Sequence, residues 1–534
     1  MSYDLLTERW IPAILTDGSA VRLSIRDAFT RASEVRRISA DLPTQSFAVL
    51  RLLLAIHHDA VGFHRSADVA ASLRDGLDQS TIAAYLDRYA DRFDLFHPER
   101  PFMQVVGLRT AKDEASPLEK LISDVPNGAP FLTTRGGEAL RVIPAHEAAL
   151  WVVHAQAFDA AGIRSGAVGD PEVKAGKGYP IGPAWAGQIG GVVLHGQTLA
   201  HTLVYNVVPT PENPLDRPVW TNDVPQTAVR QMEPDPQGPV QVLVWQSRRI
   251  RLVGDRDGVT GVVLAQGDRM TPQNRQSLEH MTAWRYSEPQ SKKHKIPVYM
   301  PRKHDPSRAA WRGMPGLVSD APSRTADGHE ESIRPATVAS LAGHSEQFTE
   351  LDTEVVVELV GIEYGPQEAT VNDMVHDSLD LRLRMLGEDA AEVQLMLYDV
   401  VRSADQAVWA LGRMAANIAS AAGDFDGVDG ARDRARETAW AELDHPARSW
   451  LGTLDADTDT IEARRDWHRR VAAVIETLAA RMAVSCSPAA VTGRMTKFGY
   501  MTAAKAESYL RAALRKELVL AYPQDPNKEA DNEQ

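Results

Sequence analysis

The C-terminal part of the chain carries a helical pattern that restricts its fold more than any other feature of the sequence. Apolar residues recur there at steps of three and four positions, as in Val393, Leu397, Val400, Ala404, Val408, Leu411, Ala415 and Ile418. This spacing places them on one face of an α-helix. Similar patterns run through residues 435–443, 471–482 and 504–518, and acidic or glycine-rich joints separate them. Four amphipathic helices with short joints predict a four-helix bundle over residues 385–523.

The preceding residues, 1–375, predict a larger N-terminal domain of mixed α-helices and β-strands, so the expected fold class is α+β. We expect a buried helix around residues 51–56, and short strands at residues 242–245, 250–253 and 262–264. Eight prolines between residues 205 and 240 predict an extended connector in place of a helix. The polar residues 524–534 predict a disordered tail.

Length, composition and charge exclude several classes of protein. The 534 residues are enough for more than one domain. Cys486 is the only cysteine, which excludes a disulfide framework and a cysteine-based zinc site. No apolar run approaches the roughly 18 residues of a membrane span, and the first residues lack the pattern of a signal peptide, so we expect cytoplasmic residence. A net charge of −14 argues against a free-standing nucleic-acid binder, but it is compatible with a subunit that contacts DNA locally.

One basic segment departs from the acidic balance of the chain. Between residues 285 and 312 there are eight lysines and arginines: Arg285, Lys292, Lys293, Lys295, Arg302, Lys303, Arg308 and Arg312. Only Glu288 and Asp305 oppose them. The segment is either a solvated basic loop or a site of phosphate or groove contact, because clustered cations neutralise phosphates and release counterions.

Motifs of enzymatic sites are weak or incomplete. The glycine-rich segment 162–196 lacks the spacing of a phosphate-binding loop and of a dinucleotide-binding turn. His-Asp pairs at residues 57–59, 304–305 and 376–377 suggest a metal-dependent His-Asp nuclease as an alternative function. Such a site needs several ligands that converge on one metal ion, and pairs so far apart are weak support for it. We expect His57 and His58 at a helix cap or on the surface, and we assign no catalytic residue, metal ligand or cofactor.

Short signatures in the first 140 residues occur in an order that is typical of one protein family. They are Arg9-Trp10-Ile11-Pro12, Pro101-Phe102-Met103-Gln104, Leu118-Glu119-Lys120-Leu121, Phe131 and Gly137-Glu138-Ala139-Leu140. A later segment, Glu363-Tyr364-Gly365-Pro366-Gln367-Glu368-Ala369-Thr370, follows a predicted strand and by itself would be an ordinary surface turn. Together they resemble the CasA family, the large Cas8-type subunits of the type I-E CRISPR surveillance complex Cascade. The resemblance spans nearly the whole chain and is strongest over residues 5–161.

The resemblance implies a DNA-binding subunit and not an enzyme. In this family the N-terminal domain lies at the end of Cascade that holds the 5′ handle of the CRISPR RNA. It recognises the protospacer-adjacent motif (PAM) of duplex DNA from the minor-groove side and initiates strand separation for R-loop formation. The C-terminal bundle contacts the small subunits and helps to hold the displaced strand. Backbone and handle-binding subunits are further implied partners, and a separate helicase-nuclease is recruited to cut the DNA. A purely structural scaffold subunit without DNA contact is the other alternative.

The same resemblance assigns three segments to DNA. A wedge that separates base pairs corresponds to Gln367, Glu368 and Ala369. The family usually has glutamine where this chain has Glu368, and we expect Gln367 to be the tip, because a carboxylate near phosphates is unfavourable. The glycine loop that lays its backbone against the groove corresponds to Gly162, Ile163, Arg164, Ser165 and Gly166, and Arg164 could itself enter a narrow groove. A groove-contacting lysine is expected among Lys292, Lys293 and Lys295.

A fourth segment, Phe131, Leu132 and Thr133, resembles the loop that docks on the RNA handle and the neighbouring subunit. Phe131 would be its stacking or wedging aromatic residue. Some relatives carry a cysteine-rich zinc knuckle before the lysine region; this chain lacks those cysteines, so the resemblance implies no zinc. The signatures around Trp10 and Phe102 are expected to build the core of the N-terminal domain, with recognition left to the loops.

Overall fold

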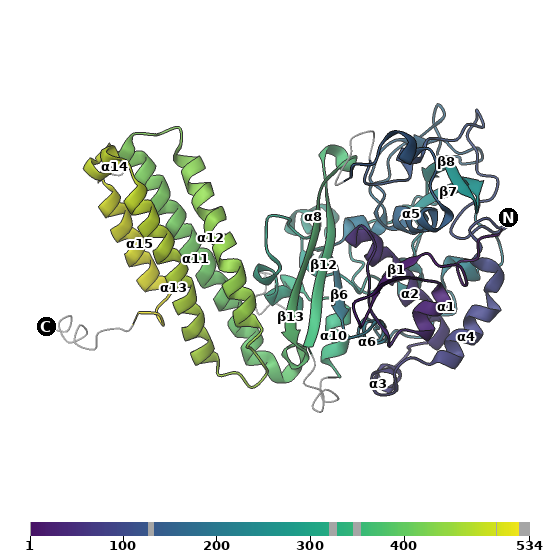
Figure 1. Ribbon diagram of the computed structural model, residues 1–534, viewed down its shortest axis with the longest axis horizontal. Helices are drawn as coiled ribbons and strands as arrows, with labels where there is room; N and C mark the ends of the chain where they lie inside the picture. Colours follow the sequence, from purple (N-terminus) through teal and green to yellow (C-terminus); the bar gives the residue numbers. More distant parts are fainter. Residues whose placement is uncertain (1, 126–132, 320–327, 345–353, 498, 523–534) are drawn as a thin grey trace. The chain divides into compact units, whose positions relative to one another are not determined.

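A computed structural model of the chain describes residues 2–125, 133–319, 328–344, 354–497 and 499–522 (Figure 1). The chain forms two compact units. The first contains Met1–Ala310 and Gly316–Leu379, and the second contains Trp311–Pro315 and Asp380–Gln534. The predicted boundary between residues 375 and 385 lies at this division, whereas the sequence did not predict that residues 311–315 belong to the second unit. The predicted tail, residues 524–534, lies outside the described residues.

The first unit combines helices with small sheets of antiparallel strand pairs, which confirms the α+β class. The helices before the bundle are α1 (Ile25–Thr30), α2 (Pro43–Val61), α3 (Ser66–Asp75), α4 (Gln79–Arg88), α5 (Ala145–Phe158), α6 (Leu199–Tyr205), α7 (Pro239–Leu243), α8 (Glu288–His294), α9 (Pro315–Val318) and α10 (Ala336–Ala342). The sheets have the strand orders β2-β1-β3, β13-β12-β6 and β10-β9-β11, and β4-β5 and β7-β8 are pairs. The strands are β1 (Ile11–Leu15), β2 (Ala20–Leu23), β3 (Val35–Ile38), β4 (Arg164–Ser165), β5 (Lys177–Gly178), β6 (Gly191–His195), β7 (Arg248–Asp255), β8 (Gly258–Gln266), β9 (Trp284–Tyr286), β10 (Tyr299–Pro301), β11 (Ser332–Ile333), β12 (Glu354–Tyr364) and β13 (Val371–Arg382).

Helix α2 lies in the core of the first unit. Pro43 occupies its first turn, where the missing N–H has no helical partner to lose, and Gly62 ends it in a left-handed conformation with a φ of 76°. The apolar run at residues 51–56 lies inside α2 and is buried, which confirms the expected helix. Arg51 is buried with it, because its guanidinium pairs with the carboxylate of Glu279 at 2.9 Å.

Two sequence predictions about this region are wrong. Residues 242–243, predicted as part of a strand, end helix α7, and Arg51 donates to the carbonyls of Val242 and Leu243 at 2.8 and 3.2 Å. His57 and His58, predicted at a cap or on the surface, are buried within α2. Burial lowers the pKa of His57 to about 3 and that of His58 to about 4, so both rings are neutral near pH 7. In both cases tertiary packing outweighs the local pattern. The other two predicted strands, at residues 250–253 and 262–264, are confirmed as parts of β7 and β8.

A long hairpin, β12 and β13, carries the segment that resembles a wedge. Strand β12 pairs with β6, where Val356 lies opposite His195, and β13 lies on the other side of β12 (Figure 1). Alternate residues of β12, Val355, Val357 and Leu359, are buried, as expected for a strand with one face on the core. The turn between the two strands is therefore held at the end of a three-stranded sheet.

Four long helices build the described part of the second unit and can be followed in Figure 1. They are α11 (Ala391–Ala422), α12 (Val428–Leu451), α13 (Thr460–Ser485) and α15 (Ala503–Glu517); the short α14 (Pro488–Thr492) and a hairpin of β14 (Arg494–Thr496) and β15 (Gly499–Met501) precede α15. Helix α11 packs against the other three. The predicted apolar face of α11 is buried from Val393 to Ala415, and Ile418 is half-buried. The helices expected from the spacing are therefore confirmed.

The segment Trp311–Pro315 adds a tryptophan to the core of the bundle. Trp311 is 2% exposed, and its ring centre lies 5.6 Å from that of Trp467 and 5.8 Å from that of Trp440. The next residue, Arg312, lies 3.5 Å from the centre of the Trp440 ring, which is a cation–π contact. A segment from the middle of the chain thus completes the core of a bundle that is otherwise C-terminal.

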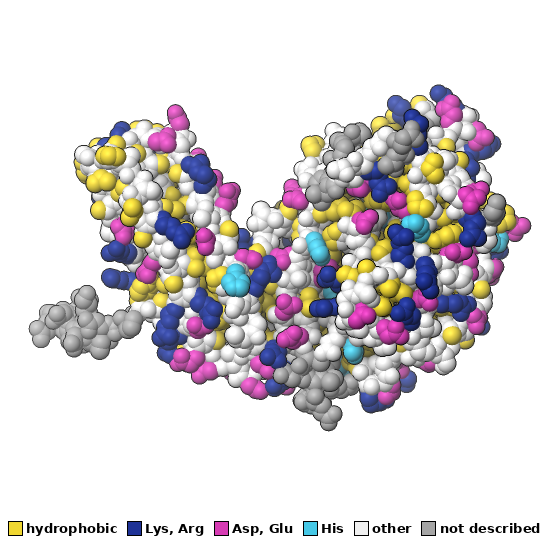
Figure 2. Space-filling view, viewed as in Figure 1, with side chains coloured by type: hydrophobic (Ala, Val, Ile, Leu, Met, Phe, Trp, Pro, Cys, Tyr) yellow, Lys and Arg dark blue, Asp and Glu magenta, His cyan; other side chains and the backbone are white. Residues whose placement is uncertain are grey.

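The surface mixes charges of both signs. Lys and Arg side chains are interspersed with Asp and Glu on the face drawn in Figure 2, in keeping with the net charge of −14. Contacts with phosphates would therefore depend on a few local cations. Within the described ranges no single helix is long and apolar enough to cross a membrane; the bent pair of α2 and α3 meets that test of length and composition only when its two helices are joined.

Candidate nucleic-acid interface

The wedge turn, residues 365–370, joins β12 to β13 in a tight and strained conformation. The N–H of Gly365 donates to the carbonyl of Thr370 at 2.8 Å, and the N–H of Glu368 donates to the carbonyl of Gly365 at 2.9 Å. Gln367 and Glu368 both have left-handed backbones, with φ of 57° and 56°. For residues with a Cβ this conformation costs about 1 kcal/mol or more each. Gln367 is exposed at the tip of the turn.

The glycine loop, residues 162–166, is attached to the wedge turn. The N–H of Ala161, directly before the loop, donates to the carbonyl of Glu368 at 2.8 Å. Gly162 has a φ of 146°, and its carbonyl accepts a hydrogen bond from the amide of Gln266 at 2.8 Å. The structure therefore brings together two of the three segments that the resemblance assigns to DNA.

The glycine loop exposes one apolar side chain and has a tightly bonded base. Its strand β4 pairs with β5, and the N–H of Gly166 donates to the carbonyl of Gly176 at 3.0 Å. A Cβ on Gly166 would lie 2.6 Å from that carbonyl oxygen, so this close approach requires glycine. Ile163 is 55% exposed at the outer side of the loop. The loop thus combines a rigid base with one exposed apolar side chain.

Arg164 points into the protein. Its guanidinium pairs with Asp159 at 2.8 Å, and its side chain is only 10% exposed. Arg248 contacts the same carboxylate at 2.5 Å and donates to the carbonyl of Ala160 at 3.1 Å. Burial alone would raise the pKa of Asp159, but the two guanidinium groups outweigh it and hold that pKa below its usual value. An Arg164 side chain that entered a DNA groove would first have to leave this buried pair.

The end of helix α5 fixes both segments. Asp159 directly follows α5, and Phe158 is its last residue. The hydroxyl of Tyr364, the last residue of β12, donates to the carbonyl of Phe158 at 2.7 Å. A Cβ on Gly187 would lie 2.2 Å from this hydroxyl, so Tyr364 has room only because residue 187 is glycine. The glycine loop and the wedge turn therefore begin at the same rigid point.

The lysine candidates lie on and just after helix α8. Lys292 pairs with Glu288 one turn earlier, at 2.6 Å. Lys293 and Lys295 are exposed, and Lys295 ends the helix with a φ of 58°. Among the described residues no hydrogen bond or ion pair connects Lys293 or Lys295 to the glycine loop or the wedge turn. The lysine that reaches the turn is Lys303, whose Nζ lies 3.3 Å from Oε1 of Glu368.

The predicted docking loop is described only in part. Phe131 and Leu132 lie outside the described residues. The hydroxyl of Thr133 accepts a hydrogen bond from the N–H of Arg135 at 3.1 Å. The guanidinium of Arg135 pairs with Glu147 on α5 at 2.5 Å. The described end of this segment is thus connected to the same helix that fixes the glycine loop and the wedge turn.

The signatures near the start of the chain build the core, as predicted. Trp10 is fully buried, and its indole N–H donates to the carbonyl of Leu5 at 3.1 Å. Phe102 is buried and stacks on Phe93, with ring centres 5.3 Å apart. These residues identify a fold because they are needed for packing.

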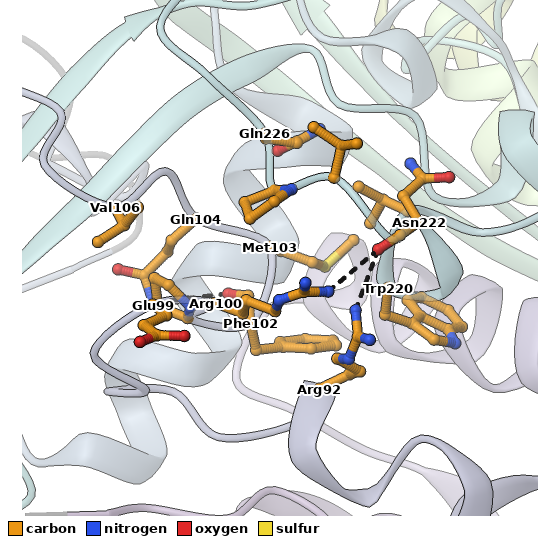
Figure 3. A pocket seen from close by; sticks show the side chains of 14 residues that line it. Arg92, Glu99, Arg100, Phe102, Met103, Gln104, Val106, Trp220, Asn222 and Gln226 are labelled. Carbon is orange, nitrogen blue, oxygen red and sulfur yellow. Dashed lines mark hydrogen bonds between the residues drawn. The ribbon is translucent and has the colours of Figure 1, made fainter.

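A small surface pocket borders the second of these signatures (Figure 3). Residues 101–104 line one side of it, and Trp220 and Asn222 come from the proline-rich connector. Arg92 and Arg100 both point to the carbonyl oxygen of Asn222 and donate to it at 3.0 and 3.5 Å. The two guanidinium groups hold the connector against the signature, which gives this pocket a structural role.

The His-Asp pairs lie in two structural settings. Asp59 accepts a hydrogen bond from the hydroxyl of Tyr85 at 2.7 Å, in a helical part of the first unit. The other two contacts lie on the sheet of β6, β12 and β13, where His304 contacts the carbonyl of Gly191 at 2.8 Å and His376 pairs with Glu358 at 2.8 Å. In the part of the chain that the structure describes, no three His, Cys, Asp or Glu side chains are placed to hold a metal ion. The geometry of the described residues therefore offers no support for a His-Asp nuclease.

Comparison with known proteins assigns the family. Residues 4–478 match the sequence model of the family described as CRISPR-associated protein Cse1. The chain belongs to this family. The CRISPR-associated protein CasA/Cse1 of Thermus thermophilus is 32% identical over 271 residues, which are 48% of this chain and 50% of that protein, so the match spans half of that relative's length.

Solved structures extend the likeness over the whole fold. The crystal structure of Thermobifida fusca Cse1 is 39% identical, with a TM-score of 0.89 over 98% of this chain and 99% of that one. A chain of a structure described as a CRISPR RNA-guided surveillance complex has a TM-score of 0.65 and 17% identity, over 90% of this chain and 99% of that one. At this identity the second likeness concerns the fold alone. The expected Cse1/CasA family and fold are confirmed.

Three residues of the interface were not assigned to it from the sequence. Asp159 and Arg248 hold the glycine loop, yet they are 89 positions apart and carry no local motif. Lys303 was one of eight basic residues in its segment, and only the contact with Glu368 distinguishes it. The sequence alone does not indicate these contacts, because burial and long-range pairing arise from the fold.

Proposed function

We propose that this Cse1 family member is the large subunit of a type I-E CRISPR RNA-guided surveillance complex and recognises the PAM of target DNA from the minor-groove side. The observation that carries this proposal is the 2.8 Å hydrogen bond from Ala161 to Glu368, because it holds the glycine loop beside the turn that exposes Gln367. A minor groove presents a degenerate pattern of acceptors, which suits reading by backbone and a few side chains.

The geometry supports different roles for the glycine loop and the wedge turn. The glycine loop would lay its outer backbone against the groove, with Ile163 as its exposed side chain. Gln367 would enter between base pairs next to the PAM and begin strand separation. Unstacking a base step costs a few kcal/mol, and contacts with the bent duplex and guide pairing offset it. Holding the turn in its strained conformation before binding means that no ordering is required when DNA arrives.

Arg164 has a positioning role in this proposal. Its guanidinium is neutralised by Asp159 inside the protein, so it would fix the base of the glycine loop and leave groove contact to the backbone. Lys293 and Lys295, exposed on and after α8, are the better candidates for contact with groove or phosphate. Lys292 would first have to leave Glu288.

The remaining contacts of the complex are assigned on the family resemblance. The segment with Phe131, Leu132 and Thr133 would dock on the 5′ handle of the CRISPR RNA and a neighbouring subunit. The bundle would contact the small subunits and the displaced strand. Cutting would belong to the recruited helicase-nuclease, and metal-dependent cleavage of DNA by the purified chain alone would contradict this assignment.

Replacing Gln367 with glycine tests the wedge. Glycine adopts the left-handed conformation without strain, so the turn should not be destabilised and only the side chain is lost. In the reconstituted complex we expect opening of the base pairs next to the PAM to fall by about tenfold or more, while weak binding to the duplex is retained. A 2-aminopurine placed beside the PAM reports opening, and a gel shift reports binding. Unchanged opening in Gln367→Gly would remove Gln367 from the proposal.

Replacing Lys293 and Lys295 with glutamine tests contact through α8. Loss of two cations near phosphates should weaken binding of the complex to PAM-containing duplex and reduce the salt dependence of log K by about 1 to 2. The matched control is the double change Arg65→Gln and Arg74→Gln at helix α3, where the two side chains are 78% and 71% exposed. Gel shifts at several salt concentrations measure both effects. A scaffold subunit without DNA contact predicts the same affinity for the double variant, the control and the parent complex.

A further inference from the structure

The wedge turn carries a carboxylate at a place where a polyanion is expected to approach. Glu368 directly follows Gln367, and its side chain is 46% exposed. Both main-chain groups of Glu368 are used: its N–H donates to the carbonyl of Gly365, and its carbonyl accepts from Ala161. The backbone at residue 368 is therefore fixed, and only the direction of its side chain remains to be set.

Lys303 sets that direction from a rigid position. On one side of it, the N–H of Arg302 donates to the carbonyl of Ala283 at 2.8 Å. On the other side, the half-buried ring of His304 contacts the carbonyl of Gly191 at 2.8 Å. The Nζ of Lys303, held between these two contacts, lies 3.3 Å from Oε1 of Glu368.

The ion pair of Lys303 and Glu368 contributes little to the free energy of folding. Both side chains are nearly half exposed, at 45% and 46%, and ion pairs in such settings contribute little to stability because water screens them and their side chains lose freedom. The interaction between the two charges should become stronger when a duplex covers the turn. An unpaired carboxylate would then face phosphates in a less polar environment, where the repulsion is stronger than in water.

We propose that Lys303 is a positioning residue for the wedge. It neutralises Glu368 and draws the carboxylate toward the end of β10, so that the neutral Gln367 is the side chain that meets DNA. This inference rests on the proposed function, and it explains how the turn tolerates an acidic residue at a place where the family usually has glutamine. The partner of the site remains PAM-containing duplex DNA, and the pair controls how strongly that duplex is bound and opened.

A double-mutant cycle separates this role from direct phosphate binding by Lys303. Complexes are reconstituted with Lys303→Met, Glu368→Gln and both substitutions, and each is measured for duplex affinity and for 2-aminopurine fluorescence beside the PAM. We expect Lys303→Met to weaken PAM-dependent binding and opening by about tenfold, and Glu368→Gln to be close to the parent. The double variant should recover to within about twofold of the parent, because no carboxylate is left to neutralise. Lys303→Arg, which keeps the charge, should retain most of the PAM-dependent binding and opening.

The outcomes also separate this inference from the proposed function. If the parent complex discriminates PAM duplexes and the double variant remains as weak as Lys303→Met, then Lys303 contacts DNA itself and the positioning role is wrong. If Lys303→Met has no effect while the parent discriminates, the pair has no role in recognition. If the parent complex does not discriminate PAM duplexes at all, the proposed function and this inference both fail. The melting temperatures of the free variants should match the parent, because the pair is exposed.

Discussion

Replacing Asp159 with alanine is expected to destabilise the first unit by about 3–5 kcal/mol, because it leaves two buried guanidinium groups without their carboxylate. The side chain of Arg248 is 1% exposed and that of Arg164 is 10% exposed, so water cannot replace the lost partner without local opening. Chemical denaturation of the purified chain, followed by circular dichroism, measures the loss. The matched control is Asp75→Ala in α3, whose carboxylate is 63% exposed and pairs with its neighbour Arg74.

A second variant shows whether the loss comes from uncompensated charge. Combining Asp159→Asn with Arg248→Met removes the carboxylate and one guanidinium together, so the double variant should lose less stability than the sum of the two single changes. If Asp159→Ala lowered the free energy of unfolding no more than Asp75→Ala, the buried triad of Asp159, Arg164 and Arg248 would be contradicted. Because the triad fixes the start of the glycine loop, PAM-dependent binding of the complex should fall together with stability.

Local spacing predicted the elements that depend on near neighbours in the chain. The apolar steps from Val393 to Ala415 define one helix face, and the run at residues 51–56 defines a buried helix; both patterns repeat within a few residues. The same kind of pattern gave a wrong prediction at residues 242–243. A short apolar run fits a strand or a helix equally well, and here contacts with Arg51 stabilise the helix. The predicted surface or cap position of His57 and His58 was wrong for a related reason, since their burial depends on what packs over α2.

The interface could be predicted only as separate segments. Family resemblance identified the glycine loop and the wedge turn, but nothing near Ala161 in the sequence indicates its hydrogen bond with Glu368, 207 positions away. The inward direction of Arg164 follows from Asp159 and Arg248. The position of Lys303 follows from the hydrogen bonds of its two neighbours in the chain to Ala283 and Gly191. Each of these contacts joins residues that are distant in sequence, or depends on burial that the fold creates.

The insertion of residues 311–315 leads to the second large expected effect: Trp311→Ala should destabilise the helical bundle by about 3–5 kcal/mol. Trp311 is 2% exposed between Trp440 and Trp467, and its removal leaves a cavity that the surrounding rings cannot close. Since the chain has two compact units, the change should lower the transition that reports bundle unfolding and leave the other less affected. Thermal melting followed at a helix-sensitive wavelength measures it.

The bundle supplies its own control for this prediction. Trp409 lies on α11 in the same unit, and it is 48% exposed. Trp409→Ala removes the same side chain but creates no buried cavity, so its cost should be a small fraction of that of Trp311→Ala. Trp311→Phe should fall between the two, because a smaller ring still fills part of the space. Equal melting temperatures for Trp311→Ala and Trp409→Ala would show that residues 311–315 only rest on the bundle. A selective loss for Trp311→Ala would instead make this segment part of the bundle core, so that the second unit folds around residues that precede it by about 70 positions in the chain.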